Sequence, residues 1–244
     1  MDPVRPRADR ARQVADVLRR QVLAGHFETA LPSEAELVEE YGATRNTVRE
    51  ALALLRAEGL VERCPGVGTT VVAHKHSHGL ERLQGLGEVF HGRGTIHNEV
   101  RALSVVRPPA AVRDHLHLGA DDEVVFIERL RRLDGIPLSL DLTYLAPDLG
   151  HQLLGRDLAN NDVFALLEEV SGQRLGHADL VVEAVSADPH SAAVLDVPRH
   201  AALLMVERLT HLEDGRPVDF EFIRFRGDRL TLHGSTSRQP RETR

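Results

Sequence analysis

Two kinds of hydrophobic pattern divide the chain into a helical first part and a strand-rich second part. Between residues 8 and 58, apolar positions recur every three or four residues, as in helices with one buried face. The clearest stripe consists of Val48, Ala51, Leu52 and Leu55. After residue 98, short apolar or alternating runs are bounded by turn-forming residues, which is typical of strands. The pattern therefore predicts an α+β chain with two domains.

Local start and stop signals place three helices in the first part. The first is expected over residues 8–23. Ser33 and Glu36 have the spacing of a capping box, in which each side chain bonds a free backbone amide at the start of a second, short helix. Thr44 is placed to cap a third helix, and Gly59 supplies the left-handed conformation that ends it.

A hairpin is expected directly after the third helix. Its strands cover residues 60–63 and 69–72, and the glycines between them permit a tight reversal. The third helix carries polar and basic side chains opposite its apolar stripe, namely those of Arg45, Asn46, Arg49 and Arg56. Two helices joined by a glycine turn, followed by a hairpin, are the layout of a winged helix-turn-helix, here over residues 1–73.

The motifs of this part resemble the N-terminal domain of the GntR superfamily of bacterial transcriptional regulators, over about residues 8–73. In order, they are Leu31-Pro32-Ser33-Glu34, Arg45-x-Thr47-Val48-Arg49-Glu50-Ala51-Leu52, Leu55, Glu58-Gly59-Leu60-Val61 and Gly66-x-Gly68-Thr69. The resemblance implies that Arg45, Thr47 and Arg49 contact the DNA operator. It implies further DNA-binding positions at Ser33, Glu34, Asn46, Gly66 and Gly68.

One position of the wing departs from the family. Its middle residue is usually arginine, which would reach the minor groove or a phosphate, and here it is Val67. We expect a weaker wing contact, or one supplied by Arg63. Without the resemblance, the basic face of the third helix also fits a solvated surface in which an arginine pairs with Glu50.

The second part contains an internal repeat. Residues 125–130 and 204–209 are apolar strands that share the Glu-Arg-Leu motif, and each leads through an Asp-Gly turn to a returning strand at 138–145 or 218–225. Further strands are expected at 99–106 and 180–185, with helices at 110–116, at 191–195 and after Asp162. Together they predict an antiparallel sheet with helices and a pseudo-repeat.

This architecture and the two repeat units resemble the effector-binding UTRA domain of the HutC-type subfamily, over about residues 83–236. That fold is similar to chorismate lyase. The resemblance implies an effector pocket lined by Gly87, Arg129, Arg131, Asp141, Phe164, Asp219 and Phe225.

The arginines of the second part indicate the chemistry of this pocket. Arg129 and Arg131 alternate along one strand and so leave the same face, where two guanidinium groups suit a phosphate or carboxylate. Gly85-Leu86-Gly87 replaces serine hydroxyls of sugar-phosphate sensors, so we expect a small anionic effector without assigning a sugar phosphate. The alternative is that Arg129, like its repeat counterpart Arg208, forms a structural ion pair.

Composition excludes several classes of function. The 244 residues hold 30 Lys+Arg and 37 Asp+Glu, for a net charge of −7, and residues 1–74 are nearly neutral, so a strongly basic nucleoid-type binder is excluded. The single cysteine, Cys64, cannot form an internal disulfide or a cysteine-based metal cluster. Without a membrane-length apolar run or a signal peptide, the chain is expected to be soluble and cytoplasmic, with no membrane partner.

Residues 74–82 are expected to be a polar linker and residues 237–244 a polar tail. The linker holds His74, His76 and His78 at alternate positions, but we favour a linker over a metal site because no carboxylate or cysteine stands at a useful spacing. Neither a metal nor a cofactor is expected.

The sequence thus predicts a homodimeric repressor that binds a near-palindromic operator and is controlled by a small anion, such as phosphate, a phosphonate, a sugar phosphate or a carboxylate. The alternative is an enzyme of chorismate-lyase-like fold acting on a carboxylated molecule. No phosphate-binding glycine loop, Gly-x-Ser-x-Gly motif or set of metal ligands supports it.

Overall fold

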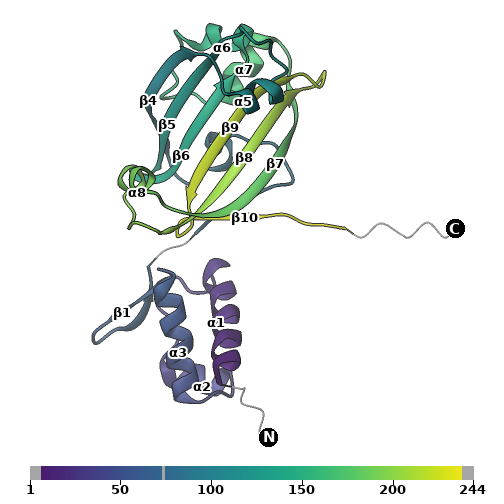
Figure 1. The fold of residues 1–244 in the computed structure, drawn as a ribbon. Helices are drawn as coiled ribbons and strands as arrows, with labels where there is room; N and C mark the ends of the chain where they lie inside the picture. The colour runs from purple at the N-terminus through teal and green to yellow at the C-terminus, as the bar shows by residue number, and fades with distance from the viewer. Residues whose placement is uncertain (1–6, 73–74, 238–244) are drawn as a thin grey trace, which may run out of the picture. The chain divides into compact units, whose positions relative to one another are not determined.

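The computed structural model describes residues 7–72 and 75–237, which form two compact units that divide between His76 and Ser77 (Figure 1). The first unit consists of α1 (Arg7–Leu23), α2 (Glu34–Glu40), α3 (Arg45–Ala57), β1 (Val61–Cys64) and β2 (Gly68–Val71). The two strands pair antiparallel, with Val61 opposite Val71. The predicted winged helix-turn-helix is confirmed.

The core of the first unit is built on the apolar stripe of α3. Val48, Ala51, Leu52 and Leu55 are all buried, and they pack with apolar residues of α1, α2 and the start of the hairpin. The segment before α2 also joins the hairpin, because the Leu31 amide donates to the Thr69 carbonyl at 2.8 Å. Helix and wing therefore share one core, which fixes the direction in which α3 presents its polar face.

The second unit is organised around a six-stranded antiparallel sheet in the order β4-β5-β6-β9-β8-β7, seen from left to right in Figure 1. Its strands are β4 (Ile96–Val106), β5 (Val124–Leu133), β6 (Ile136–Leu145), β7 (Leu175–Ser186), β8 (Ala202–Leu212) and β9 (Pro217–Arg226). Strands β6 and β9 pair at the centre, where the two copies of the repeat meet. The predicted α+β fold with an internal repeat is confirmed.

Helices cover both faces of this sheet. They are α4 (Leu86–Val89), α5 (Ala110–His115), α6 (Pro147–Leu153), α7 (Val163–Ser171) and α8 (Pro189–Leu195). Apolar residues of α5 and α8 pack on one face, beside Phe220 and Leu130 respectively, whereas α4, α6 and α7 pack on the other. Among the described residues, no helix is long and apolar enough to cross a membrane.

Part of the segment expected to be a linker belongs to the second unit. His76–Gly79 forms β3, which pairs with β10 (Leu230–His233) in a separate two-stranded sheet. The side chains join the strands as well, because Ser77 Oγ lies 2.8 Å from His233 Nδ1. Only a contact across 156 positions of the chain makes this strand, so no local pattern indicates it. His74 and most of the polar tail, residues 238–244, lie outside the described residues.

One close approach fixes α6 on the sheet. A methyl group placed on Gly150 would lie 2.9 Å from Val125 Cβ and 3.0 Å from Leu145 Cβ, and these atoms are held by the backbones of β5 and β6. We expect Gly150→Ala to lower the free energy of unfolding by about 1–3 kcal/mol, because the helix must move away from the sheet. Urea unfolding, with hydrogen exchange of the β5 and β6 amides, measures the effect.

The matched control is Gly155→Ala, where an added methyl group would meet nothing within 4 Å. Its effect should stay within about 0.5 kcal/mol. Equal losses in the two variants would show that α6 does not depend on this contact.

Candidate functional sites

The first candidate surface is the exposed N-terminal end of α3. Thr44 caps the helix by accepting the Thr47 amide at 3.2 Å, and Arg45, Asn46 and Arg49 are exposed. Thr47 differs from these neighbours, because it is only 5% exposed and its hydroxyl lies 2.9 Å from Thr44 Oγ1. The structure thus gives Thr47 a capping contact and leaves the other three side chains available on the surface.

An ion pair joins α3 to the start of α2. Arg49 Nε donates to Glu34 Oε2 at 2.9 Å, so the arginine pairs with Glu34 and not with Glu50. Ser33 sits just before Glu34 and caps α2 through the predicted capping box: its amide donates to Glu36 Oε2 at 2.7 Å. The hydrogen bond from the Ser33 hydroxyl, with that from its amide, lowers the pKa of Glu36. Glu34 and Arg49, which are both predicted to bind DNA, thus contact each other when DNA is absent.

The two residues of this ion pair line a polar depression. It has a volume of about 200 Å³ and is lined by Glu34, Arg49, Leu52, Arg56, Arg63 and Thr69. The three arginines come from α3 and from β1 of the wing. Several guanidinium groups that line one depression suit the phosphates of a nucleic acid backbone. Arg63 is the residue expected to supply the wing contact in place of Val67, whereas Arg56 was noted only as part of the polar face of the third helix.

The wing turn depends on two glycines. Gly66 and Gly68 adopt φ angles of +80° and +115°, which other residues rarely adopt. Val67 lies between them and is 68% exposed, so an apolar side chain stands at the tip of the wing. A valine can donate no hydrogen bond to a phosphate or a base, and the wing can contact DNA there only through its backbone or by apolar contact.

The second candidate site begins with ionisable side chains buried in the central sheet. Arg129 and Arg131 on β5, Asp141 on β6, and Asp219 and Glu221 on β9 are each no more than 3% exposed. Burying a charge without a partner is costly, so such groups are expected to pair.

Two ion pairs hold most of this charge. Arg131 pairs with Asp141 across β5 and β6, and Ser139 Oγ donates to Asp141 Oδ1 at 2.8 Å. On the other half of the sheet, Arg208 pairs with Glu221 across β8 and β9. The Asp141 carboxylate is thus already occupied by protein groups, which limits its role as a direct ligand contact.

Phe164 contributes to the second pair. Its ring lies 4.4 Å from the guanidinium carbon of Arg208, which is a cation–π contact. The residue lies on α7, whose start is capped by Asp162. Asp162 Oδ2 also accepts the Gly87 amide at 3.3 Å, so Gly87 anchors the start of α4 to α7.

Arg129, on β5 opposite Asp141, belongs to neither ion pair. Its Nε and Nη1 have no hydrogen-bond partner among the described residues. Burial, and next the charge of Arg131, lower its pKa to about 10. The alternative of a carboxylate partner therefore describes Arg131 and Arg208 better than it describes Arg129.

Asp219 is a buried acidic residue that, like Arg129, has an atom without a hydrogen-bond partner among the described residues. Burial, and next the charge of Glu221, raise its pKa well above the ordinary value of 3.8. Thr210 Oγ1 donates to Asp219 Oδ2 at 3.4 Å, while Oδ1 has no partner among the described residues. A protonated Asp219 would relieve the repulsion with Glu221.

A cavity of about 250 Å³ opens over the sheet beside these groups. Its lining includes three arginines, Arg82, Arg131 and Arg208, one acidic residue, Glu81, and the histidines His78 and His177. Apolar walls come mainly from Leu86, Val206, Ile223 and Phe225. An apolar cavity with a few convergent charged groups is the usual form of a small-molecule site.

Only two of the predicted effector-binding residues, Arg131 and Phe225, line this cavity. The others, Gly87, Arg129, Asp141, Phe164 and Asp219, lie behind it and hold or surround the lining residues. Arg208 and Arg82 are lining residues that the sequence analysis did not select. Arg208 was treated as the structural counterpart of Arg129, and only its position on β8 shows that it faces the cavity.

Each of the two units matches the model of a known protein family. Residues 10–71 match the model of the bacterial regulatory proteins of the gntR family, and residues 92–231 match the UTRA domain. The chain is 27% identical over 223 residues to the HTH-type transcriptional repressor NagR of Bacillus subtilis (strain 168), covering 90% of this chain and 91% of that protein.

It is 31% identical over 225 residues to the HTH-type transcriptional regulator Rv0792c of Mycobacterium tuberculosis, covering 89% and 82% of the two chains. Among solved structures, PhnF from Mycobacterium smegmatis has the same fold, with a TM-score of 0.65 at 22% identity, covering 93% of this chain and all of that one.

The exposed face of α3 gives a first test. Arg49→Ala should weaken binding to an operator selected from random-sequence DNA by about 1–3 kcal/mol and relax base preference at one position per half-site. The fold should remain, because Arg49 is exposed and lies opposite the buried stripe. Fluorescence anisotropy at fixed salt measures the affinity.

Arg20→Ala, an exposed arginine on α1, is the matched control and should bind the selected operator almost as the wild type does. If Arg49→Ala kept both the affinity and the base preference, Arg49 would not read DNA.

Asp219 gives a second test, through pH. A carboxyl group whose pKa is raised by folding stabilises the fold fully below its unfolded pKa of about 3.9, and this stabilisation is lost as the pH rises through the folded pKa. Asp219→Asn removes that loss because an amide does not ionise. The stability of the variant relative to wild type should therefore increase by up to about 1.4 kcal/mol per pH unit within this window.

Thermal unfolding between pH 4 and pH 8 follows this difference, with the exposed Asp121→Asn as control. A difference between Asp219→Asn and wild type that does not change with pH would mean that Asp219 is ionised throughout.

Proposed function

The chain belongs to the gntR family of bacterial regulatory proteins, in the group that carries a UTRA domain, and from this membership we propose a repressor controlled by a small anion. The family is one of DNA-binding transcriptional regulators, so the chorismate-lyase-like enzyme considered from the sequence is excluded. The observation that carries the proposal is the cavity lined by Arg82, Arg131 and Arg208.

The balance of charge in the cavity favours an anion. The guanidinium groups of Arg131 and Arg208 each pair with a carboxylate behind the wall, so these two charges are compensated. Arg129 lies near the carboxylate of Asp162, and the wall itself carries Arg82 and Glu81, so the lining holds three arginines against one acidic residue. An anionic ligand would receive hydrogen bonds from the arginines of the lining, which suit a phosphate or carboxylate group.

The size of the cavity narrows the ligand class. Its volume of about 250 Å³ is below the roughly 300–1,000 Å³ of sites for drug-sized molecules. The ligand is therefore a small metabolite that combines a phosphate, phosphonate or carboxylate group with an apolar or lightly polar body, since much of the lining is apolar. No particular metabolite is assigned.

We infer that the functional form is a homodimer. Both edge strands of the sheet expose apolar side chains: Val100, Leu103 and Val105 on β4, and Leu180, Val181 and Val182 on β7. A long edge strand with exposed apolar residues is a template for pairing with another chain. A second copy would also place two α3 helices on two half-sites about one helical turn apart.

Effector binding can control DNA binding because the two binding equilibria are thermodynamically coupled. A ligand shifts an equilibrium only by its difference in affinity for the two states. We propose that the anion prefers the arrangement of the dimer in which the two DNA-binding units no longer match both half-sites, so that effector binding releases the operator.

The test uses variants that keep the buried ion pairs. Truncating Arg131 would leave Asp141 buried without a partner, so Arg131→Lys and Arg82→Gln are preferred. Arg131→Lys keeps the charge but loses the planar fork, and Arg82→Gln removes an exposed charge of the wall. Both should weaken effector binding about ten- to hundredfold and leave effector-free operator binding near wild type.

A thermal-shift panel of inorganic phosphate, phosphonates, sugar phosphates and carboxylates finds the ligand, and anisotropy with labelled operator measures the response. Arg199→Gln, an exposed arginine after α8, is the control. Variants that respond at the wild-type ligand concentration would remove the effector from this cavity.

A further inference from the structure

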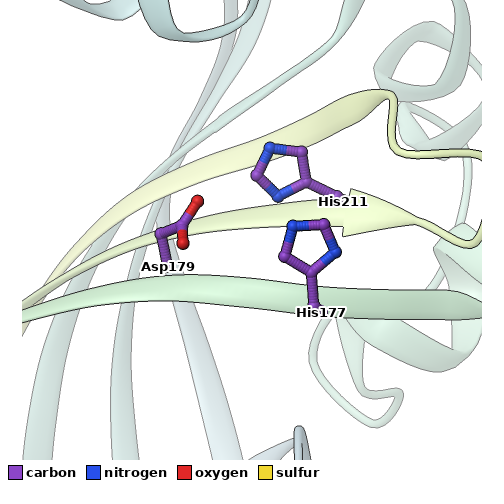
Figure 2. A group of neighbouring side chains, drawn as sticks. All are labelled: His177, Asp179 and His211. Atoms are coloured by element: carbon purple, nitrogen blue, oxygen red, sulfur yellow. The ribbon is translucent and has the colours of Figure 1, made fainter. Parts of the chain in front are cut away.

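Three side chains able to bind a metal ion meet on strands β7 and β8. His177 and His211 are direct partners in the β7–β8 ladder, and Asp179 follows two residues along β7. One ligand atom from each lies within 4.8 Å of the others. Figure 2 shows the two imidazole rings and the carboxylate gathered over these strands. The function proposed above uses none of the three.

Of the three residues, His211 has a buried nitrogen atom that lacks a hydrogen-bond partner among the described residues. This atom is Nδ1, and the residue as a whole is only 8% exposed. Buried polar atoms are normally bonded, because an unpaired one costs free energy. The ring of His177 stacks on that of His211, with centroids 4.3 Å apart and planes 3° from parallel. Both rings are therefore held close together at one end of the edge strand.

We propose that His177, Asp179 and His211 form a site for a divalent transition-metal ion of the zinc class. Two imidazole nitrogens and one carboxylate oxygen suit zinc, cobalt or nickel, whereas magnesium and calcium prefer oxygen ligands alone. A tetrahedral ion with bonds of about 2.1 Å holds its ligands roughly 3.4 Å apart, so the three groups need to approach by at most about 1.4 Å. Rotation of the side chains supplies a movement of that size and also turns the two rings out of their parallel stack, as they must because an ion lies in the plane of each imidazole that binds it; water takes the fourth position.

The position of the site indicates what the ion does. Among the described residues, β7 is an edge strand whose single neighbour is β8, so an ion bound by both strands adds a link between the edge strand and the rest of the sheet. His177 also borders the cavity, whereas Asp179 and His211 do not. The ion therefore fixes one wall of the cavity and the end of a strand that exposes apolar residues.

No local sequence motif predicts this site. His177 and Asp179 form only a His-x-Asp pattern, and His211 is 34 positions away from His177, so the register of β7 against β8 alone brings the three together. The alternate histidines at 74, 76 and 78 are a more conspicuous sequence feature.

Zinc titration of the full chain tests the proposal. The protein is prepared without an affinity tag, stripped with chelator and studied without DNA or anion, so the outcome does not depend on the proposed function. Calorimetry should show one zinc ion bound per chain at this site, and thermal unfolding should shift upward with zinc, because the ion binds the folded state. Cobalt serves as a second probe, since its visible absorption reports the coordination.

His177→Ala and Asp179→Asn alter exposed residues and should leave the fold intact. Loss of an outer-shell partner already costs about ten- to hundredfold in metal affinity, so loss of a ligand should weaken zinc by at least about tenfold. His190→Ala, an exposed histidine on α8, should bind zinc as the wild type does. No zinc binding by the wild type, or binding that His177→Ala and Asp179→Asn leave unchanged, overturns the proposal.

Discussion

Pairing of charge inside the sheet is the constraint on which the second unit depends. Several arginine and acidic side chains on the central strands are buried and paired, and removing one partner of such a pair costs about 3–5 kcal/mol of stability. The pairs Arg131–Asp141 and Arg208–Glu221 both cross between neighbouring strands. A shift of one residue in the strand register would separate them and turn charges toward the apolar cores, so the pairs fix the register as well as the cavity wall.

The internal repeat explains why the two halves are not equivalent. In the first copy, Ser139 donates to Asp141 and supports its charge. In the second copy, Asp219 stands at the position of Ser139 and Glu221 at that of Asp141. The strand β9 therefore carries two carboxyl groups two residues apart. Burial and the neighbouring Glu221 raise the pKa of Asp219, at the position where the first copy has the hydroxyl of Ser139. The repeat positions of Arg131 and Ser139 are occupied by Thr210 and Asp219 in the second copy, so Arg131 and Arg208, which both line the cavity, have different surroundings.

Local patterns in the sequence were sufficient for the helices and for most of the sheet. The stripe of Val48 and its neighbours predicts the buried face of α3, and the spacing of Ser33 and Glu36 predicts the cap of α2, because each depends on residues three or four apart. The partners of charged residues could not be read in this way. Arg49 pairs with Glu34 and Arg131 with Asp141 only because the fold brings distant segments together. The strand β3 and the exposure of Arg208 to the cavity depend on tertiary structure in the same manner.

The proposed repressor couples its two units: binding of an anion beside Arg131 and Arg208 opposes binding of an operator by α3. Linkage requires the effect to be reciprocal. The most direct measurement is the dissociation constant of the effector, determined by calorimetry with and without saturating operator. The account predicts weaker effector binding to the DNA complex, by at least about fivefold and by the same factor with which effector weakens the operator. Equal effector affinity for the free and the DNA-bound protein would contradict it.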